Sequence, residues 1–260
     1  VVSSEERQRS EEPMLFSNRY KFLFVHIAKT AGTSIQSALK RLRRRDPLSY
    51  PQVLCYNFSK IFRHRIGTKI PRHARAVAAY DVMPREQFEE FFKFTFIRNP
   101  WDIQVSAFYH LKREWPDVMS ENGCVEFGDY LRWNFNPDRS YHRAVDPLNQ
   151  NMIDYMINMD GSMLMDYIGC FERLKDDWAE ICSRIGVPTL DLPRKRVSQS
   201  RADYREYYDE ELSELVENHY RRDIEAFGYS FDGKLPSGSL QGEVSAKFRR
   251  SVSFDLVTEL

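Results

Sequence analysis

The sequence predicts a single α/β domain in which a parallel β-sheet is flanked by helices on both faces. Its 260 residues suffice for one well-buried domain and are few for two. Three short apolar stretches are nearly continuous, which is typical of strands that are covered on both faces. A helical pattern follows each of them, and strand–loop–helix units in series favour a parallel sheet.

We expect these elements at defined places along the chain. The predicted strands are Tyr20–Ile27, Phe91–Arg98 and Met165–Phe171. The first helix that follows them is predicted after the loop, where Ile35, Leu39 and Leu42 fall at helical spacing, and it ends in the basic run KRLRRR. The other two are predicted over Trp101–Lys112 and over Leu174–Ile185. Two further helices are predicted over Asn149–Met159 and Asp209–Phe227, the second of them closed by Gly228.

The two ends of the chain differ in composition from the domain, which we expect over residues 14–232. Residues 1–13 are polar and charged without a period, so they predict a flexible leader. From Gly233 onward Gly, Ser and Pro accumulate, and residues 233–260 are expected to form a tail that is flexible or docks elsewhere. We find no stretch of about 18 apolar residues and no signal-peptide core, so we expect a soluble chain without a membrane span.

Charge and cysteine usage exclude several classes of function. Lys plus Arg and Asp plus Glu both number 38, so no overall field recruits nucleic acid or a membrane surface. The four cysteines form no CxxC pair and no dense framework. Buried reduced thiols are therefore expected, and neither zinc nor disulfides.

The loop after the first predicted strand has the composition of a phosphate-binding loop. It reads KTAGTS, from Lys29 to Ser34, and leads directly into a helix. The start of a helix presents backbone N–H groups without internal acceptors, Gly32 allows close approach of the backbone, and the hydroxyl and ammonium groups add donors. The GxxxxGK[ST] pattern of nucleoside-triphosphate enzymes is absent, because Lys29 precedes the single glycine. The loop predicts a P-loop-like core that binds a different phosphate compound.

A second charged stretch follows the second predicted strand. It reads FIRNPWDIQVSAFYH and places Arg98 at the end of the strand and Ser106 two turns into the next helix. A guanidinium suits a terminal phosphate because it donates to two oxygens at once. The alternative for Arg98 is a structural ion pair at the end of a strand.

Together the two stretches resemble the sulfotransferases that use 3′-phosphoadenosine 5′-phosphosulfate (PAPS), and in particular their carbohydrate type. That family has a P-K-T-G/A-G-T-S loop for the 5′-phosphosulfate and an R-N-P-x-x-R-x-x-S-x-Y stretch for the 3′-phosphate. This chain reads IAKTAGTS and RNPWDIQVSAFY. It departs at Ala28, where proline is common, and at Ile103-Gln104, where a basic residue is usual. The resemblance extends from about Phe22 to Phe231.

The resemblance implies transfer of a sulfuryl group from PAPS to a hydroxyl, with PAP as the product and no metal. A compartment follows from the source: the cytoplasm for a bacterial enzyme, or the Golgi lumen for a trimmed eukaryotic catalytic domain. Lys29 is expected to stabilise the leaving phosphate oxygen. The residues expected to bind the donor are Lys29, Thr30, Ala31, Gly32, Thr33, Ser34, Arg98, Ser106 and Arg201.

A hydroxyl acceptor needs a general base, and histidine has a suitable pKa. His73 is our choice, because family members carry a K-H-x-x-A-like stretch between the two phosphate motifs and this chain reads PRHARA. His26 belongs to the lead-in to the loop. His142 is the second choice, since it lies in the variable segment expected to face the acceptor, and Glu126 is a further alternative.

The acceptor is expected to be a carbohydrate, and an anionic one if the basic stretch between residues 60 and 75 contacts it. Arg63 and Arg65 of this stretch, together with His142, are the candidate acceptor-binding residues. A solvated basic loop is the alternative for this stretch. Two other functions remain to be tested against sulfuryl transfer, a P-loop nucleotide kinase or NTPase and a non-catalytic nucleotide-binding adaptor of the same fold. The oligomeric state is open.

Overall fold

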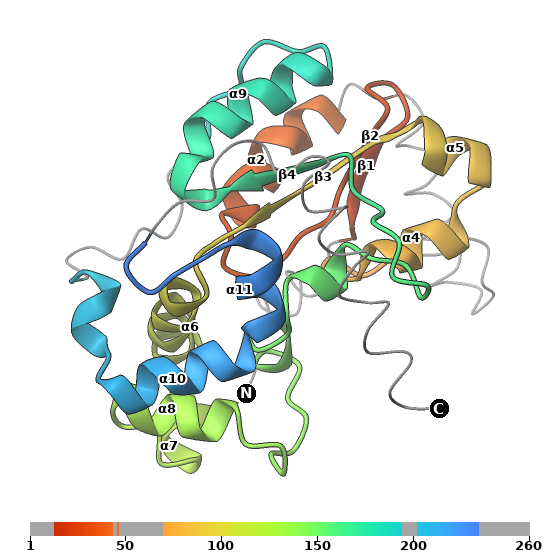
Figure 1. Cartoon of the computed structure of the whole chain (residues 1–260). Helices are drawn as coiled ribbons and strands as arrows, with labels where there is room; N and C mark the ends of the chain where they lie inside the picture. Colours follow the sequence, from red (N-terminus) through yellow and green to blue (C-terminus); the bar gives the residue numbers. More distant parts are fainter. Residues whose placement is uncertain (1–12, 44–45, 47–69, 194–201, 234–260) are drawn as a thin grey trace.

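A four-stranded sheet with the strand order β1-β2-β3-β4 lies at the centre of the chain (Figure 1). The computed structural model describes residues 13–43, 46, 70–193 and 202–233, and every structural statement below concerns these residues. The strands are β1 (Leu15–Ser17), β2 (Phe22–Phe24), β3 (Phe92–Ile97) and β4 (Tyr167–Cys170). β2, β3 and β4 are parallel, which confirms the predicted α/β fold, and β1 adds an antiparallel edge that was not predicted.

The register of the parallel strands brings the functional loops together. Phe24 of β2 pairs with Phe94 of β3, and Ile97 of β3 pairs with Cys170 of β4. The carboxyl ends of the three strands therefore lie at the same edge of the sheet. In open α/β sheets this edge carries the ligand site.

The helices are short apart from those that follow β2, β3 and β4. The α-helices are α2 (Gly32–Arg43), α4 (Ala76–Val82), α5 (Arg85–Glu90), α6 (Pro100–Glu114), α7 (Pro116–Glu121), α8 (Phe127–Asn134), α9 (Leu174–Arg184), α10 (Glu210–His219) and α11 (Arg221–Phe227). The 3₁₀ helices are η1 (Asp146–Leu148), η2 (Ile153–Tyr155), η3 (Phe171–Arg173) and η4 (Tyr204–Tyr207).

Successive side chains along each strand point to opposite faces of the sheet and pack into two hydrophobic cores, one on each face. Phe22 and Phe24 of β2 point to the core that α2 and α9 cover, where Trp178 is buried. Leu23 and Val25 point to the opposite core, which α6, α8, α10 and α11 cover. Figure 1 shows α2 and α9 on one side of the sheet and α6, α10 and α11 on the other. The predicted helices on both faces are thus confirmed.

Asn99 explains why α6 begins where it does. Its side chain accepts hydrogen bonds from the backbone N–H groups of Trp101 and Asp102, and Pro100 occupies the first helical position, where the missing N–H has no cost. The cap fixes the direction of α6 immediately after β3. The same turn therefore aims one face of α6 along the carboxyl edge of the sheet.

Two predicted helices need correction. Residues 149–159 contain only η2, and the buried carboxylate of Asp223 accepts from the backbone N–H groups of Met152 and Ile153 there. The predicted helix Asp209–Phe227 is two helices, α10 and α11, which meet at Tyr220. The hydroxyl of Tyr220 is buried and donates to the oxygen of Leu148, so tertiary packing breaks the periodic pattern. Gly228 closes α11 in the left-handed conformation, as predicted.

None of the helices in the described segments is both long enough and apolar enough to cross a membrane.

Candidate active site

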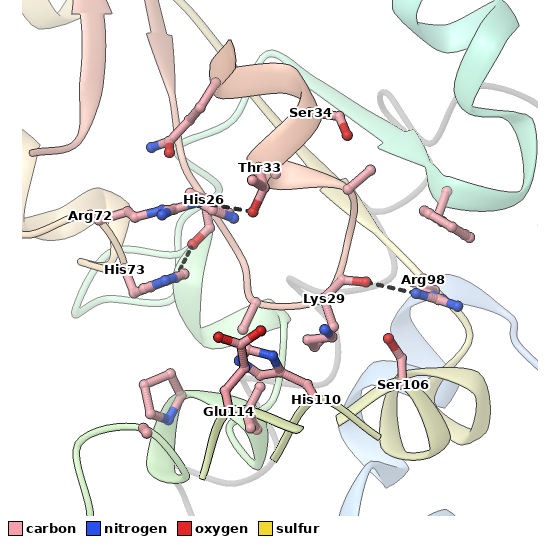
Figure 2. A pocket seen from close by; sticks show the side chains of 18 of the residues that line it. His26, Lys29, Thr33, Ser34, Arg72, His73, Arg98, Ser106, His110 and Glu114 are labelled. Carbon is pink, nitrogen blue, oxygen red and sulfur yellow. Dashed lines mark hydrogen bonds between the residues drawn. The ribbon is translucent and has the colours of Figure 1, made fainter. Parts of the chain in front are cut away.

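A cleft of about 1620 Å³ opens at the carboxyl edge of the sheet. The segments that line it include the loop between β2 and α2, the stretch around Arg72, one face of α6, and the loop that follows residue 140. In Figure 2, Arg98 and Ser106 lie on one side of Lys29, and Arg72 and His73 lie on the other. The structure therefore brings both predicted phosphate motifs and the predicted base to one cleft.

The loop between β2 and α2 has an unusual backbone. Lys29 and Ala31 have φ angles of 65° and 67°, in the left-handed region that non-glycine residues adopt only at a cost. Nη1 of Arg98 donates to the carbonyl oxygen of Lys29 over 3.0 Å, which helps hold this conformation. The oxygen of Ala31 accepts from the N–H groups of Ser34 and Ile35 and so begins α2. The N–H groups of Gly32 and Thr33 precede the first internal bond of the helix, which is the position that binds anions.

Gly32 is required by a contact that the sequence did not indicate. A Cβ atom at this position would lie 1.9 Å from both Cδ2 and Nε2 of His26, whose ring is buried against the start of α2. Real Cβ contacts are never this short, so any side chain at Gly32 would displace the imidazole. The glycine thus makes room for His26, in addition to any close approach by a ligand.

The three hydroxyl groups of the loop have different surroundings. Thr30 is fully buried and donates to the carbonyl oxygen of Ile27 over 3.0 Å, so its side chain stabilises the loop and does not line the cleft. Thr33 and Ser34 do line the cleft. Of the predicted donor ligands in the loop, Thr30 is therefore limited to its backbone.

Arg98 is both a cleft residue and a structural residue. Its Nε and Nη2 contact Oδ2 of Asp102, at 2.8 and 2.6 Å, and its guanidinium stacks on the ring of Phe171. Burial lowers the pKa of Arg98 to about 10 against the opposing effect of Glu172, so the group stays charged at neutral pH. Five N–H donors allow a guanidinium to keep these contacts and still donate to a ligand in the cleft.

The departure at Ile103-Gln104 has a structural explanation. Both side chains point away from the cleft and are buried in the core, where Nε2 of Gln104 donates to the hydroxyl of Tyr220 over 2.7 Å. These two positions accordingly supply no charge to the cleft. The predicted 3′-phosphate contacts fall to Arg98 and Ser106 on the described part of the chain.

His73 is held in one tautomer by a backbone oxygen of the segment that follows β2. Its Nδ1 lies 3.0 Å from the backbone oxygen of His26. Because a carbonyl oxygen only accepts, Nδ1 must carry the proton, and the lone pair of the neutral ring is on Nε2. Burial and then the charge of Arg72 lower the pKa of His73 to about 4. The ring is therefore neutral at physiological pH, in the form that can accept a proton.

A second histidine belongs to the same group. Nε of Arg72 donates to Nδ1 of His26 over 2.8 Å, and Nη2 of Arg72 donates to Oγ1 of Thr33 over 3.2 Å. The rings of His26 and His73 have their centroids 4.5 Å apart. Burial, then His73, and then Arg72 lower the pKa of His26 well below its usual value.

Besides the predicted Ser106, one face of α6 contributes three cleft residues that were not predicted from the sequence. Asp102, Ser106, His110 and Glu114 all line the cleft, and they recur every four residues along the helix. His110 and Glu114 line the same cleft as Lys29, and Figure 2 shows all three. The signal was present in the sequence, because polar residues at i, i+4 and i+8 share one face of a helix.

The remaining predicted residues are elsewhere. His142 does not line the cleft but packs edge-on against Trp115, with 5.3 Å between ring centroids. Glu126 precedes α8 and forms a capping box with Asp129, so it serves the start of that helix. Arg63, Arg65 and Arg201 lie outside the described residues.

Comparisons with known proteins identify the family of this chain. Residues 12–230 match the sulfotransferase family. Carbohydrate sulfotransferase 14 of Mus musculus is 22% identical over 221 residues, which cover 76% of this chain and 52% of the mouse protein. An uncharacterized protein of Archaeoglobus fulgidus is 27% identical over 105 residues, which cover 40% of this chain and 75% of the archaeal protein. The match thus spans about half the length of the mouse relative. No solved structure matches this chain.

Because the family match covers most of its length, the chain belongs to the sulfotransferase family. Within the described residues, no group of three or more His, Cys, Asp or Glu side chains is arranged to hold a metal ion.

Proposed function

We propose that this protein transfers the sulfuryl group of PAPS to a hydroxyl of a carbohydrate. One observation carries the proposal: a single cleft contains Lys29 in a loop at a helix start, the Arg98–Ser106 pair, and the neutral His73. An in-line transfer needs a cation at the leaving phosphate oxygen, groups that bind the donor nucleotide, and a base for the acceptor hydroxyl. The family match over residues 12–230 supports it. The catalytic domain that we propose spans residues 14–232.

The residues present fit an anionic nucleotide donor. The N–H groups of Gly32 and Thr33 point from the start of α2, which is twelve residues long, and Lys29 adds a positive charge beside them. Arg98 and Ser106 supply further donors from the end of β3 and from α6. The loop would bind the 5′-phosphosulfate and the Arg98–Ser106 pair the 3′-phosphate, while the donor supplies the activated sulfuryl group.

Lys29 would stabilise the charge that develops on the leaving phosphate oxygen. A preorganised cation at this point acts mainly in the transition state, because the leaving oxygen becomes more negative as its bond to sulfur breaks. The carbonyl of Lys29 is tethered to Arg98, so the position of the lysine is coupled to the donor site.

His73 would accept the proton of the acceptor hydroxyl at Nε2. Its Nδ1 proton is bound to the oxygen of His26, so the ring is oriented with the lone pair on the other nitrogen. The acceptor oxygen then attacks sulfur as its proton passes to Nε2, and the bond from sulfur to the phosphate oxygen breaks.

Aromatic side chains support a carbohydrate at the acceptor end of the cleft. Trp115 and Tyr141 line it, and Tyr141 is 77% exposed. Arg143 lines the same region and lies over the ring of Trp115 at 5.6 Å. Sugar rings stack on such faces, and a guanidinium beside them favours an acceptor that carries carboxylate or sulfate groups. This agrees with the anionic acceptor proposed from Arg63 and Arg65.

A transfer assay tests the function and the acceptor class together. We expect radiolabelled sulfate from PAPS to appear on a uronate-bearing polysaccharide, with less label on a neutral dextran of similar size. Arg143→Gln should raise KM for the anionic acceptor severalfold and leave KM for PAPS unchanged. Equal labelling of both polysaccharides would contradict the anionic acceptor, and PAPS consumption with neither labelled would contradict a carbohydrate acceptor.

A further inference from the structure

Arg72 is a cleft residue to which neither donor binding nor proton transfer assigns a role. It directly precedes His73 and donates to Nδ1 of His26 at 2.8 Å and to Oγ1 of Thr33 at 3.2 Å. One side chain thus joins the end of β2, the first turn of α2 and the segment that carries the base, as Figure 2 shows. The side chain is partly buried, so these bonds are only partly screened by water.

We propose that Arg72 is a positioning residue that keeps the His26–His73 pair neutral and couples the base to the donor loop. This inference rests on the proposed role of His73. The first half follows from the hydrogen bonds. Because Nδ1 of His26 accepts from Arg72, it cannot carry a proton, and the proton of the neutral ring is on Nε2. The ring of His26 is then fixed beside Gly32, and its backbone oxygen remains the acceptor for His73.

The charge of Arg72 links the base to the donor. A sulfuryl donor carries several negative charges, and an anion near His73 favours the imidazolium, which has no lone pair with which to accept a proton. The guanidinium of Arg72 acts in the opposite direction, and it is adjacent to both histidines. Arg72 is the charged side chain that lowers the pKa of both rings, after burial for His73 and after burial and His73 for His26. Its charge therefore keeps the base competent when an anion occupies the cleft.

Other titratable groups share the cleft with His73 and come from several elements. These are His26 from the end of β2, Lys29 from the loop, Lys40 from α2, Arg98 from the end of β3, Asp102, His110 and Glu114 from α6, Tyr141, Arg143 and Asp146 from the loop after residue 140, Tyr155 from η2, and Asp203 and Tyr204 at the start of η4. All of them remain in the variants below, so a difference between variants reports the change at Arg72.

The test uses three variants of the full chain and the ring resonances of its histidines in nuclear magnetic resonance titrations without donor. Arg72→Gln removes the charge, Arg72→Lys keeps the charge but not the forked geometry, and Arg75→Gln is the matched control. Arg75 lies on the same segment, faces Asp154 at 3.9 Å and does not line the cleft. Asp154 keeps its ion pair with Arg222 in that control.

We expect Arg72→Gln to move the titration midpoint of His73 to higher pH by about one unit, the size of effect that one neighbouring charge produces. Arg75→Gln should leave the midpoint unchanged, and Arg72→Lys should keep it low while altering the nitrogen resonances of His26. In turnover with PAPS, the acid limb of kcat/KM should move to higher pH in Arg72→Gln, and activity should recover at high pH. A purely structural role would lower activity at every pH.

An unchanged His73 midpoint in a folded Arg72→Gln variant would overturn the proposal. If that variant does not fold, the titrations of the wild type and of Arg72→Lys test the proposal instead. A proton on Nε2 rather than Nδ1 of His73 at neutral pH, or a midpoint in Arg72→Lys as high as an exposed histidine, would also overturn it. The titrations need no turnover, so a protein that shows the expected midpoints but transfers no sulfate contradicts the proposed function alone.

Discussion

Replacing His73 with alanine is expected to lower kcat for sulfuryl transfer by about 10²–10⁴-fold, the usual contribution of a general base. The affinity for PAP should change by less than about threefold, because His73 lies on the opposite side of Lys29 from Arg98 and Ser106. Steady-state turnover with PAPS and calorimetric titration with PAP give the two quantities.

The matched control is His142→Ala. Its ring packs against Trp115 beside the cleft, so kcat should stay within a few-fold of the wild type. If His73→Ala turns over at the wild-type rate, the base is a different residue. The cleft then favours Glu114 or His110 over His142 and Glu126, because only the first two line it.

Replacing Lys29 with methionine is expected to lower kcat by about 10²–10³-fold, the cost of removing one preorganised charge from a developing oxyanion. Methionine retains an unbranched chain of similar length, so the change removes the charge and little volume. PAP lacks the sulfuryl group, so its affinity should fall much less than kcat. Single-turnover measurements with PAPS separate the transfer step from product release.

Lys40→Met provides a matched comparison for Lys29→Met. Lys40 lines the same cleft from α2, and its replacement removes the same charge by the same substitution. We expect kcat to change by less than about fivefold. Equal losses in the two variants would mean that the cleft uses only its total charge, and would contradict a specific role for Lys29 at the leaving oxygen.

The sequence was sufficient to predict the parallel sheet and the loop because both are local patterns. Apolar runs such as those of β2 and β3 reveal buried strands, and a Lys-Thr-x-Gly-Thr-Ser loop before a helix is contiguous in the chain. The antiparallel strand β1 could not be recognised in this way. It has three residues and is defined by its pairing with β2 rather than by its own pattern.

The rest of the candidate site depends on contacts between distant segments. The bond from Arg72 to His26 joins residues 46 positions apart, and the bond from Arg98 to Lys29 joins residues 69 apart. The steric need for Gly32 likewise comes from the ring of His26 and not from the loop itself. Such contacts leave no periodic signal, whereas the Ser106–His110–Glu114 face of α6 did leave one that a helical projection would have shown.

The most direct test of the account is a calorimetric titration with PAP and, in parallel, with ATP, in buffer that contains a chelator and no magnesium. The account predicts that PAP binds at least about tenfold more tightly than ATP, a difference of about 1.4 kcal/mol. It also predicts that Arg98→Ala abolishes this preference and that Ser106→Ala weakens it without lowering the melting temperature. A preference for ATP, or no binding of either nucleotide by the folded wild type, would contradict a PAPS-dependent sulfotransferase. A kinase would then account for a preference for ATP, and a non-catalytic adaptor would account for the lack of binding.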